Sequence, residues 1–201
     1  MVLYNPKTLT LFKRGDDFKV KPWLFTDQRF GLLNYWLVTE KMDGMSVILS
    51  ANSENYGIHG RSPNTQFTPE QESFLHDQTS AVIGRLSKHI LYDGKKVDIY
   101  AELVGPGVNG NSHNFKDLQL YVFDVRINDF WLDWTNTASV AQDADLVTVP
   151  VIYTMTLPEI VRLVRDTPQT EYFEGIVARS DPYLYNNKGE RLMFKLKAKD
   201  F

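Results

Sequence analysis

Residues 35–50 read YWLVTEKMDGMSVILS, and the fold is predicted outward from this stretch. Aromatic and β-branched residues on both sides of Glu40–Gly44 predict two strands joined by a tight turn that contains Gly44. Such a hairpin would hold the ammonium group of Lys41 at the edge of a sheet, where a lysine has no structural role, and this placement indicates a nucleophile. Taken alone, Lys-x-Asp-Gly also fits an ordinary hairpin turn, because Asp and Gly are common turn residues.

Further segments with charged or aromatic side chains follow in a fixed order along the chain. They are Gly60-Arg61-Ser62, Ala101-Glu102-Leu103-Val104-Gly105, Val122-Phe123-Asp124-Val125, Glu174-Gly175-Ile176-Val177-Ala178-Arg179 and Phe194-Lys195-Leu196-Lys197. The last segment places two lysines at i and i+2 of a predicted strand, so both side chains lie on one face. The whole series, rather than any single member, predicts the function.

This series resembles the covalent nucleotidyltransferase superfamily, which contains ATP-dependent DNA and RNA ligases and GTP-dependent mRNA capping enzymes. The similarity runs from about Glu40 to Lys197, and Glu102–Asn111 is most similar to the RNA ligases that seal nicks in duplex RNA. The resemblance implies an ATP-dependent RNA ligase with an α+β fold. In that fold, two antiparallel sheets flanked by helices form an ATP-grasp-like nucleotidyltransferase domain, with the nucleotide between the sheets.

The composition is that of one compact catalytic domain covering residues 1–201. Of the 201 residues, 43% are hydrophobic and 13% are aromatic, which is enough for a single core. No apolar stretch approaches the roughly 18 residues of a membrane span, and the N-terminus lacks the features of a signal peptide. We therefore expect a soluble, cytoplasmic monomer that does not associate with membranes. The absence of cysteine excludes disulfides and thiolate chemistry.

The net charge is unusual for an enzyme that acts on nucleic acid. The 22 Lys and Arg residues and 25 Asp and Glu residues give −3, whereas a phosphate-binding protein usually has a basic surplus. Positive residues gather near the C-terminal end, at Lys188, Arg191, Lys195, Lys197 and Lys199. We therefore expect positive charge to be concentrated on one face, and the resemblance implies RNA ends in a nicked duplex as the partner.

Helix signals occur at three places. Thr68-Pro69-Glu70-Gln71 combines a cap, a proline at the first helical position and a glutamine three residues after the cap, so it predicts a helix that ends near Asp93-Gly94. Thr156 with Glu159 predicts a second capping box and a short helix, and Thr135–Asp145 is a polar, helix-compatible connection. The other regular runs predict strands, namely Tyr56–Gly60, Val97–Leu103, Leu118–Val125, Val147–Tyr153, Gly175–Arg179 and Arg191–Lys197.

The resemblance gives Lys41 the role of nucleophile. Lys41 attacks the α-phosphorus of ATP and becomes lysyl-AMP; AMP then passes to a 5′-phosphate end, and a 3′-hydroxyl displaces it to join the strands. The attacking amine must be neutral, yet an ordinary lysine pKa of about 10.4 leaves few molecules deprotonated near neutral pH. Lys195 and Lys197, the other two catalytic lysines, would lower the pKa of Lys41 and neutralise the α-phosphate. Their residue pattern alone also fits an amphipathic edge strand.

The remaining site residues take nucleotide-binding roles from the resemblance, together with Lys195 and Lys197 at the phosphates. They are Glu40 at the adenine or in organising the site, Arg61 at the ribose and substrate phosphate, Glu102 at the ribose, Phe123 stacked on the purine, and Glu174 at the metal or its bound water. The implied metal is Mg²⁺ or Mn²⁺. The residues alone also fit two strand-edge glutamates in water, a solvated turn arginine and a core phenylalanine.

Other functions stay open at this point. A DNA ligase core would carry the same series, because the 2′-hydroxyl contacts that separate the two have no pattern here. A nucleotide- or RNA-binding module without turnover is a second alternative, although the intact lysine and both glutamates argue against it. Gly105-x-Gly107-x-x-Gly110 fits a dinucleotide fingerprint, but no apolar helix pattern follows it. The chain ends shortly after Lys197, so we expect no C-terminal oligonucleotide-binding domain, which argues against a capping enzyme.

Overall fold

The computed structural model describes residues 7–86, 94–110, 113–167 and 173–201. Within these ranges the chain forms two compact units. The first, here called the terminal unit, comprises Met1–Met42 and Pro150–Phe201, and the second, the central unit, is Asp43–Val149. The chain therefore passes from one unit to the other twice, and the first crossing directly follows Lys41 and Met42.

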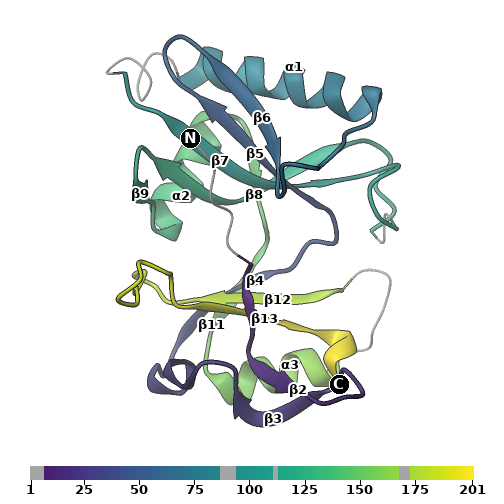
Figure 1. Ribbon diagram of the computed structural model, residues 1–201, viewed down its shortest axis with the longest axis vertical. Helices are drawn as coiled ribbons and strands as arrows, with labels where there is room; N and C mark the ends of the chain where they lie inside the picture. Colours follow the sequence, from purple (N-terminus) through teal and green to yellow (C-terminus); the bar gives the residue numbers. More distant parts are fainter. Residues whose placement is uncertain (1–6, 87–93, 111–112, 168–172) are drawn as a thin grey trace. The chain divides into compact units, whose positions relative to one another are not determined.

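The terminal unit is built on a five-stranded sheet with the strand order β1-β13-β12-β4-β11. Neighbouring strands are antiparallel except at one edge, where β1 lies parallel to β13. A two-stranded sheet, one α-helix and two 3-10 helices complete the described part of this unit (Figure 1). The elements are β1 (Leu9–Thr10), β2 (Phe12–Arg14), β3 (Val20–Phe25), η1 (Gln28–Leu32), β4 (Trp36–Glu40), β11 (Val151–Met155), α3 (Leu157–Asp166), β12 (Gly175–Arg179), β13 (Met193–Lys197) and η2 (Ala198–Asp200).

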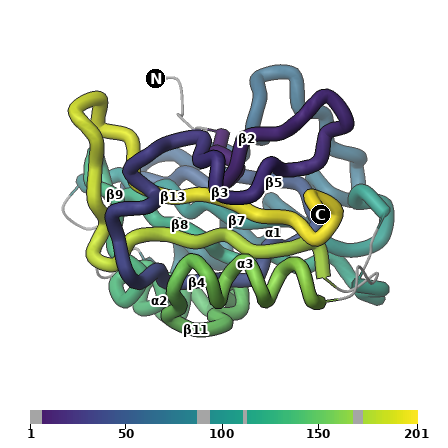
Figure 2. Tube along the Cα trace, turned by 90° about the horizontal axis from the view of Figure 1, so that it is seen from below, coloured from purple at the N-terminus to yellow at the C-terminus, as the bar shows by residue number. Residues whose placement is uncertain are grey.

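Helix α3 covers one face of the five-stranded sheet (Figure 2). Ile160 of the helix packs in the same core cluster as Phe194 and Leu196 of β13, and all three side chains are fully buried. Because side chains alternate along a strand, Lys195 and Lys197 project from the opposite face of β13. The apolar half of this strand thus anchors it, and the other half presents two lysines.

The central unit is built on a six-stranded sheet in which β10, β8, β7, β5 and β6 follow one another and β9 pairs with β8. Helices α1 and α2 cover one face, where Leu75 and Val140 pack in one cluster with Ala101 and Val122. Glu102, the neighbour of Ala101, therefore lies on the face away from the helices. The elements are β5 (Met45–Ala51), β6 (Tyr56–Gly60), α1 (Pro69–Leu86), β7 (Val97–Val104), β8 (Gln119–Ile127), β9 (Phe130–Trp131), α2 (Trp134–Asp143) and β10 (Val147–Thr148).

Both predicted capping boxes are present. At the start of α1, the Thr68 N–H donates to Gln71 Oε1 at 3.1 Å, and the Gln71 N–H donates to Thr68 Oγ1 at 3.3 Å. At the start of α3, Glu159 Oε2 accepts hydrogen bonds from the N–H and the hydroxyl of Thr156 at 2.8 and 2.7 Å. Each box satisfies backbone donors that the first helical turn leaves without an intrahelical partner.

The predicted hairpin around Lys41 is wrong. Strand β4 pairs with β11 and β12 in the terminal unit, whereas β5 pairs with β6 and β7 in the central unit. Gly44 is needed for space rather than for a turn, since a Cβ there would lie 2.3 Å from the carbonyl oxygen of Leu103. The segment from Lys41 to Gly44 is therefore a crossing between units, and Lys41 stands just past the end of a strand.

The predicted strand Val147–Tyr153 is in fact two strands. It divides at Val149 and Pro150 into β10, which joins the six-stranded sheet, and β11, which joins the five-stranded sheet. Proline has no N–H for a continuous ladder, which explains a break at this position. The expectation of two antiparallel sheets is also incomplete, because β2 and β3 form a third sheet and each large sheet has a parallel edge pair. The N-terminal strands had no predicted counterpart.

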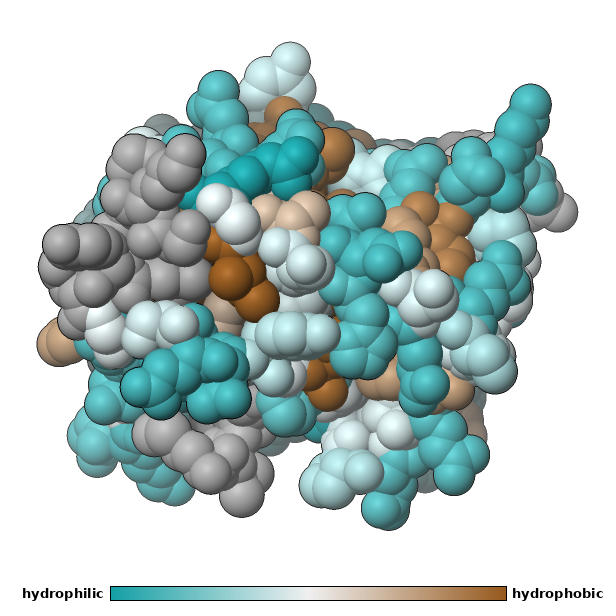
Figure 3. All heavy atoms as spheres, turned by 90° about the horizontal axis from the view of Figure 1, so that it is seen from above, coloured by the Kyte–Doolittle hydropathy of each residue, from teal (hydrophilic) through white to brown (hydrophobic). Residues whose placement is uncertain are grey.

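The mixed α+β class is confirmed, as are the other predicted strands and the helical nature of the polar connection, which is α2. Strands Tyr56–Gly60 and Gly175–Arg179 have the predicted bounds. Helix α1 is described as far as Leu86, and its predicted end near Asp93 lies outside the described residues. No helix in the described ranges is long and apolar enough to cross a lipid bilayer. Hydrophilic residues cover most of the face drawn in Figure 3, and apolar residues form small separate patches there.

Candidate active site

Lys41, Glu174 and Lys197 form a compact charged cluster in the terminal unit. The Nζ of Lys41 contacts Oε2 of Glu174, and the Nζ of Lys197 contacts Oε1 of the same carboxylate. The Lys41 ammonium also donates to the carbonyl oxygen of Met42 at 3.4 Å. One carboxylate thus bridges two lysines that lie far apart in the sequence.

Three neighbouring strands bring these side chains to one end of the sheet. Gly175, the first residue of β12, pairs with Lys197 of β13, and its carbonyl oxygen accepts a hydrogen bond from the Lys41 N–H at 3.0 Å. Gly175 has a φ of +147°, and a Cβ there would lie 2.2 Å from the carbonyl oxygen of Leu196. Only glycine tolerates this conformation and this approach. The Glu-Gly pair therefore places the Glu174 carboxylate between the two lysines.

The cluster is partly buried and still reachable from solvent. The side chains of Lys41, Glu174 and Lys197 are 20%, 17% and 18% exposed. Charged groups at this depth lose part of their hydration, and the ion pairs with Glu174 offset part of that cost. Because each group keeps some exposed area, an anionic ligand can reach both ammonium groups.

Two further predicted residues belong to the same sheet. Lys195 is half-buried and projects from the same face of β13 as Lys197. Glu40, the last residue of β4, pairs with Ile176 of β12, and its N–H donates to the carbonyl oxygen of Pro150 at 2.9 Å. The structure therefore gathers five predicted residues in the terminal unit, namely Glu40, Lys41, Glu174, Lys195 and Lys197.

The other three predicted residues, Arg61, Glu102 and Phe123, belong to the central unit. Arg61 directly follows β6 and is exposed. Glu102 is half-buried in β7, opposite Ser46 of β5. The surroundings of Arg61 thus match the solvated turn that its residue pattern also allowed, whereas Glu102 is not a fully solvated strand-edge residue.

Phe123 occupies a β-bulge in β8. Tyr100 pairs with Asp124 and Ala101 pairs with Val122, so Phe123 is an extra residue with no partner of its own in β7. Its ring is half-buried and its centroid lies 6.5 Å from that of Tyr100, a phenol whose pKa is raised by burial. Bulges redirect side chains and are frequent beside active sites. Phe123 is therefore not the fully buried core residue that its strand pattern also allowed.

Arg14 and Asp200 form a positioning pair that the sequence did not reveal. Arg14 Nη2 lies 2.5 Å from Oδ1 of Asp200, whose side chain is 2% exposed. Oδ2 of Asp200 accepts a hydrogen bond from the Lys197 N–H at 2.9 Å. The pair thereby fixes the end of β13 that carries Lys197. The sequence offers one signal for this pair, an aspartate that follows a run of lysines. Arg14 gives no signal, because no element is predicted in its segment.

No group of three or more His, Cys, Asp or Glu side chains within the described ranges is arranged to hold a metal ion. Glu174 is the carboxylate that lies within the lysine cluster. A divalent cation at this point would have one protein carboxylate and would take its other ligands from water and bound phosphates, an arrangement that Mg²⁺ commonly adopts.

Comparison with known proteins gives one family match and several structural matches. The model of a family described as RNA ligase matches residues 34–197. No curated protein sequence matches the chain.

The structural matches are to an RNA ligase of Naegleria gruberi. A variant solved with AMP and manganese has a TM-score of 0.62 and 18% identity, over 98% of this chain and 63% of that chain. A second variant with AMP and manganese has a TM-score of 0.64 and 17% identity, with the same coverage. A third, solved with ATP and manganese, has a TM-score of 0.62 and 18% identity, over 98% and 64%. At these identities the likeness is one of fold, and this chain spans less than two thirds of the length of those ligases.

Proposed function

This chain belongs to the RNA ligase family, and we propose that it is an ATP-dependent RNA ligase in which Lys41 is the nucleophile. The observation that carries the proposal is the cluster in which Glu174 bridges Lys41 and Lys197. A nucleophilic amine for phosphoryl chemistry needs cations beside it and access to a bound nucleotide, and this cluster supplies both.

In the first transfer, the Lys41 Nζ bonds to the α-phosphorus of ATP. The bond between the α-phosphorus and the oxygen that bridges to the β-phosphate breaks, and pyrophosphate leaves. The attacking amine must be neutral, so the Lys41 ammonium releases one proton to water and its ion pair with Glu174 ends before the new bond forms. A second proton passes from the nitrogen to water once the N–P bond has formed. Lys195 and Lys197, on one face of β13, then neutralise charge on the α-phosphate as it becomes pentacoordinate.

The later transfers move AMP onto RNA and then release it. A 5′-phosphate oxygen of the RNA attacks the α-phosphorus of lysyl-AMP, which frees Lys41 and leaves an adenylylated end. A 3′-hydroxyl then attacks the RNA 5′-phosphorus, and AMP departs as the phosphodiester forms. Family membership supports RNA as the substrate, and the sequence of Glu102–Asn111 supports a nick in duplex RNA.

The proposal gives the other predicted residues nucleotide-binding roles. Phe123 stacks on the purine, a use that its half-buried position at a bulge supports. Glu102 and Arg61 hydrogen-bond to the ribose and a phosphate, and Glu40 binds at the adenine. Phe123→Ala would weaken ATP binding, because a base-stacking contact is worth about 1 to 3 kcal/mol.

The residues of the cluster also fit a divalent cation. Glu174 offers two carboxylate oxygens that now bind ammonium groups, and a cation that shares nucleotide phosphates can take the place of one of them. Mg²⁺ or Mn²⁺ held by Glu174 would offset phosphate charge when bound. The manganese of the N. gruberi ligase structures supports this part of the proposal.

A covalent-labelling assay tests the proposal. The full chain and its Lys41→Ala variant would be incubated with ATP labelled at the α-phosphate and Mg²⁺, then separated on a denaturing gel. We expect a labelled band for the wild type and none for Lys41→Ala. Lys21→Ala, which removes an exposed lysine of β3, is the matched control and should label like the wild type.

Equal labelling of wild type and Lys41→Ala would rule out Lys41 as the nucleophile. Labelling with GTP but not ATP would move the chain to capping-type chemistry. The substrate is then tested with nicked RNA, nicked DNA and single-stranded RNA, each with a 5′-phosphate. Sealing of nicked DNA alone would contradict the RNA assignment, because a protein tells the two substrates apart through the 2′-hydroxyl.

A further inference from the structure

A cavity of about 470 Å³ lies in the terminal unit where β1, β2 and the end of β13 come together. Its lining includes six cationic side chains, from Lys7, Lys13, Arg14, Lys195, Lys197 and Lys199, and no acidic residue. Three of these cations come from the N-terminal segment, which the resemblance did not assign to the site. The cavity therefore concentrates positive charge in a chain whose net charge is −3.

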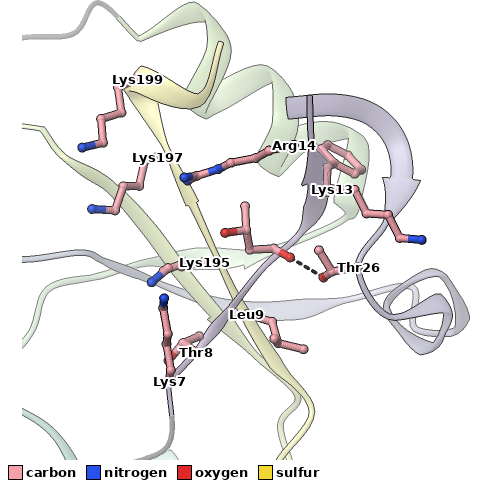
Figure 4. Close-up of a pocket in the computed structure, with 11 residues that line it drawn as sticks. Lys7, Thr8, Leu9, Lys13, Arg14, Thr26, Lys195, Lys197 and Lys199 are labelled. Carbon is pink, nitrogen blue, oxygen red and sulfur yellow. Dashed lines mark hydrogen bonds between the residues drawn. The ribbon is translucent and has the colours of Figure 1, made fainter. Parts of the chain in front are cut away.

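The cationic groups converge on one side of β13. In Figure 4 the side chains of Lys7 and Lys195 point toward each other, and those of Lys197 and Lys199 extend to the same side of β13. Arg14 extends toward Lys197, whereas Lys13 extends to the other side. Several charges of one sign in so small a region repel one another unless an anion lies between them. The geometry is that of a site for a compact anion.

Nearby carboxylates compensate only part of this charge. Arg14 pairs with Asp200, and Lys197 pairs with Glu174. In the described part of the chain, Lys7 and Lys199 form no ion pair with a carboxylate, and both are exposed. Two cations are thus available to a ligand without the loss of an internal ion pair.

Lys197 connects the cavity to the proposed nucleophile. Its Nζ contacts the Glu174 carboxylate, whose other oxygen contacts Lys41, and the same side chain lines the cavity. When Lys41 attacks the α-phosphorus, the leaving group departs in line with the new bond, on the far side of the phosphorus. A cation-lined cavity one side chain away from Lys41 is suited to receive that group.

We propose that this cavity binds the β- and γ-phosphates of the nucleotide and holds the pyrophosphate that leaves, with Lys7 and Lys199 as binding residues outside the predicted series. The inference rests on the proposed function and adds a subsite to it. Pyrophosphate concentrates its charge in two adjacent phosphates, whereas a nucleic-acid strand spreads one charge per nucleotide along its length. Cations that converge on one cavity match the compact anion better than the extended one.

Binding of inorganic pyrophosphate, measured by calorimetry on the full chain without nucleotide, tests the subsite apart from catalysis. We expect the double variant Lys7→Ala/Lys199→Ala to bind pyrophosphate at least about tenfold more weakly, because two charge-assisted contacts are lost. Both lysines are exposed, so the fold should persist, and Lys7→Ala alone is the fallback if the double variant does not fold. Lys21→Ala/Lys188→Ala, which removes two exposed lysines that do not line the cavity, is the charge-matched control and should bind like the wild type.

Binding of nicked duplex RNA by the same variants distinguishes the two sources of phosphate. Weaker pyrophosphate binding with unchanged RNA binding supports the proposal. Unchanged pyrophosphate binding in the double variant overturns it, and weaker RNA binding in that case would assign the cavity to the nucleic-acid backbone. Loss of Lys41 labelling is a separate result, because it overturns the proposed function while pyrophosphate binding still reports on the cavity.

Discussion

The terminal unit and the central unit carry net charges of opposite sign. Met1–Met42 and Pro150–Phe201 hold 15 Lys and Arg against 11 Asp and Glu, a formal charge of +4, whereas Asp43–Val149 holds 7 against 14, a charge of −7. The value of −3 for the whole chain is the sum of these charges and describes neither unit. A low overall charge is therefore compatible with a basic unit that binds phosphates.

In the central unit, charged groups stabilise the local structure. Asp98 is 1% exposed, accepts a hydrogen bond from Ser50 Oγ at 2.5 Å and pairs with Lys96 at 2.8 Å. Arg126, near the end of β8, pairs at 2.7 Å with Asp129, which lies just beyond that strand. These contacts pair the charges of Asp98 and Arg126 with groups of the protein itself.

In the terminal unit, the cations around the candidate site exceed the carboxylates that pair with them. Lys41 and Lys197 share Glu174, and among the described residues Lys7 and Lys199 have no carboxylate partner. An excess of cations around a cavity is useful only when an anion binds. Removal of a charge from the Glu174 cluster of the terminal unit should therefore abolish chemistry, whereas removal of the charge of Asp98 in the central unit should lower stability.

The largest expected effect is on nucleotide transfer in the terminal unit. Lys197→Ala and Glu174→Gln should each lower the rate of Lys41 labelling at least about 100-fold, because each removes a charge next to the reacting phosphate. The rate is measured from the labelled band at early times under saturating ATP. The temperature of unfolding should change little, since both side chains keep some exposure and neither is part of the apolar core.

Lys188→Ala is the matched control for Lys197→Ala. Lys188 is an exposed lysine on the connection between β12 and β13. Its backbone N–H donates to Oδ1 of Asn186, and alanine keeps this hydrogen bond. The comparison of units would fail if Lys197→Ala labelled at the rate of Lys188→Ala. In that case the lysines of β13 would be ordinary surface residues.

A smaller effect, on stability alone, is expected in the central unit. Asp98→Asn keeps the shape of the side chain but removes its negative charge and one of its two acceptor oxygens. The ion pair with Lys96 is lost and the hydrogen bond from Ser50 is weakened, so the free energy of unfolding should fall by about 2 kcal/mol. Urea denaturation measures this change. Asp77→Asn, on the exposed side of α1, removes the same charge and should cost less than about 0.5 kcal/mol. Equal costs would show that the buried carboxylate is no different from a solvated one.

The parts of the fold that the sequence predicted are those with strong local patterns. The two capping boxes and the strands at Tyr56–Gly60 and Gly175–Arg179 follow from residue spacing within each segment. The expectation that Lys41, Glu174 and Lys197 belong to one site followed from the family resemblance. The structure supplies a physical reason, because Gly175 allows the start of β12 to approach the end of β13 closely beside Lys41.

The parts that could not be predicted depend on which segments meet. Strand propensity in residues 35–50 is correct, but it does not record that the two strands belong to different sheets. The Gly44 signal is ambiguous for the same reason, since a glycine required by the Leu103 carbonyl oxygen looks in sequence like a turn glycine. The pair of Arg14 and Asp200 joins the two ends of the chain, and no local pattern reports such a contact.

The smallest expected effect comes from the two capping boxes, which differ in one group. In the central unit the box of α1 uses the neutral amide of Gln71, whereas in the terminal unit the box of α3 uses the carboxylate of Glu159. The hydrogen bond from the backbone N–H of Thr156 holds the pKa of Glu159 below its ordinary value of 4.5. A carboxyl group whose pKa is lowered by folding stabilises the fold above its unfolded pKa, and that contribution is lost as the pH falls through the lower, folded value.

Replacement of Glu159 by glutamine should therefore make the box of α3 behave like the box of α1. The urea midpoint of Glu159→Gln should lie slightly below that of the wild type between pH 5 and pH 7, and the difference should shrink as the pH falls below about 4.5. Glu72→Gln is the matched control, because Glu72 also lies in the first turn of a helix. The capping box of that helix is formed by Thr68 and Gln71, and among the described residues the side chain of Glu72 takes no part in it. A midpoint difference that stays constant down to pH 3 would mean that the charge of Glu159 adds nothing to the cap. The boxes of α1 and α3 would then depend on equivalent neutral hydrogen bonds. The difference between the units in how charged groups are used would rest on the candidate site and on the buried Asp98.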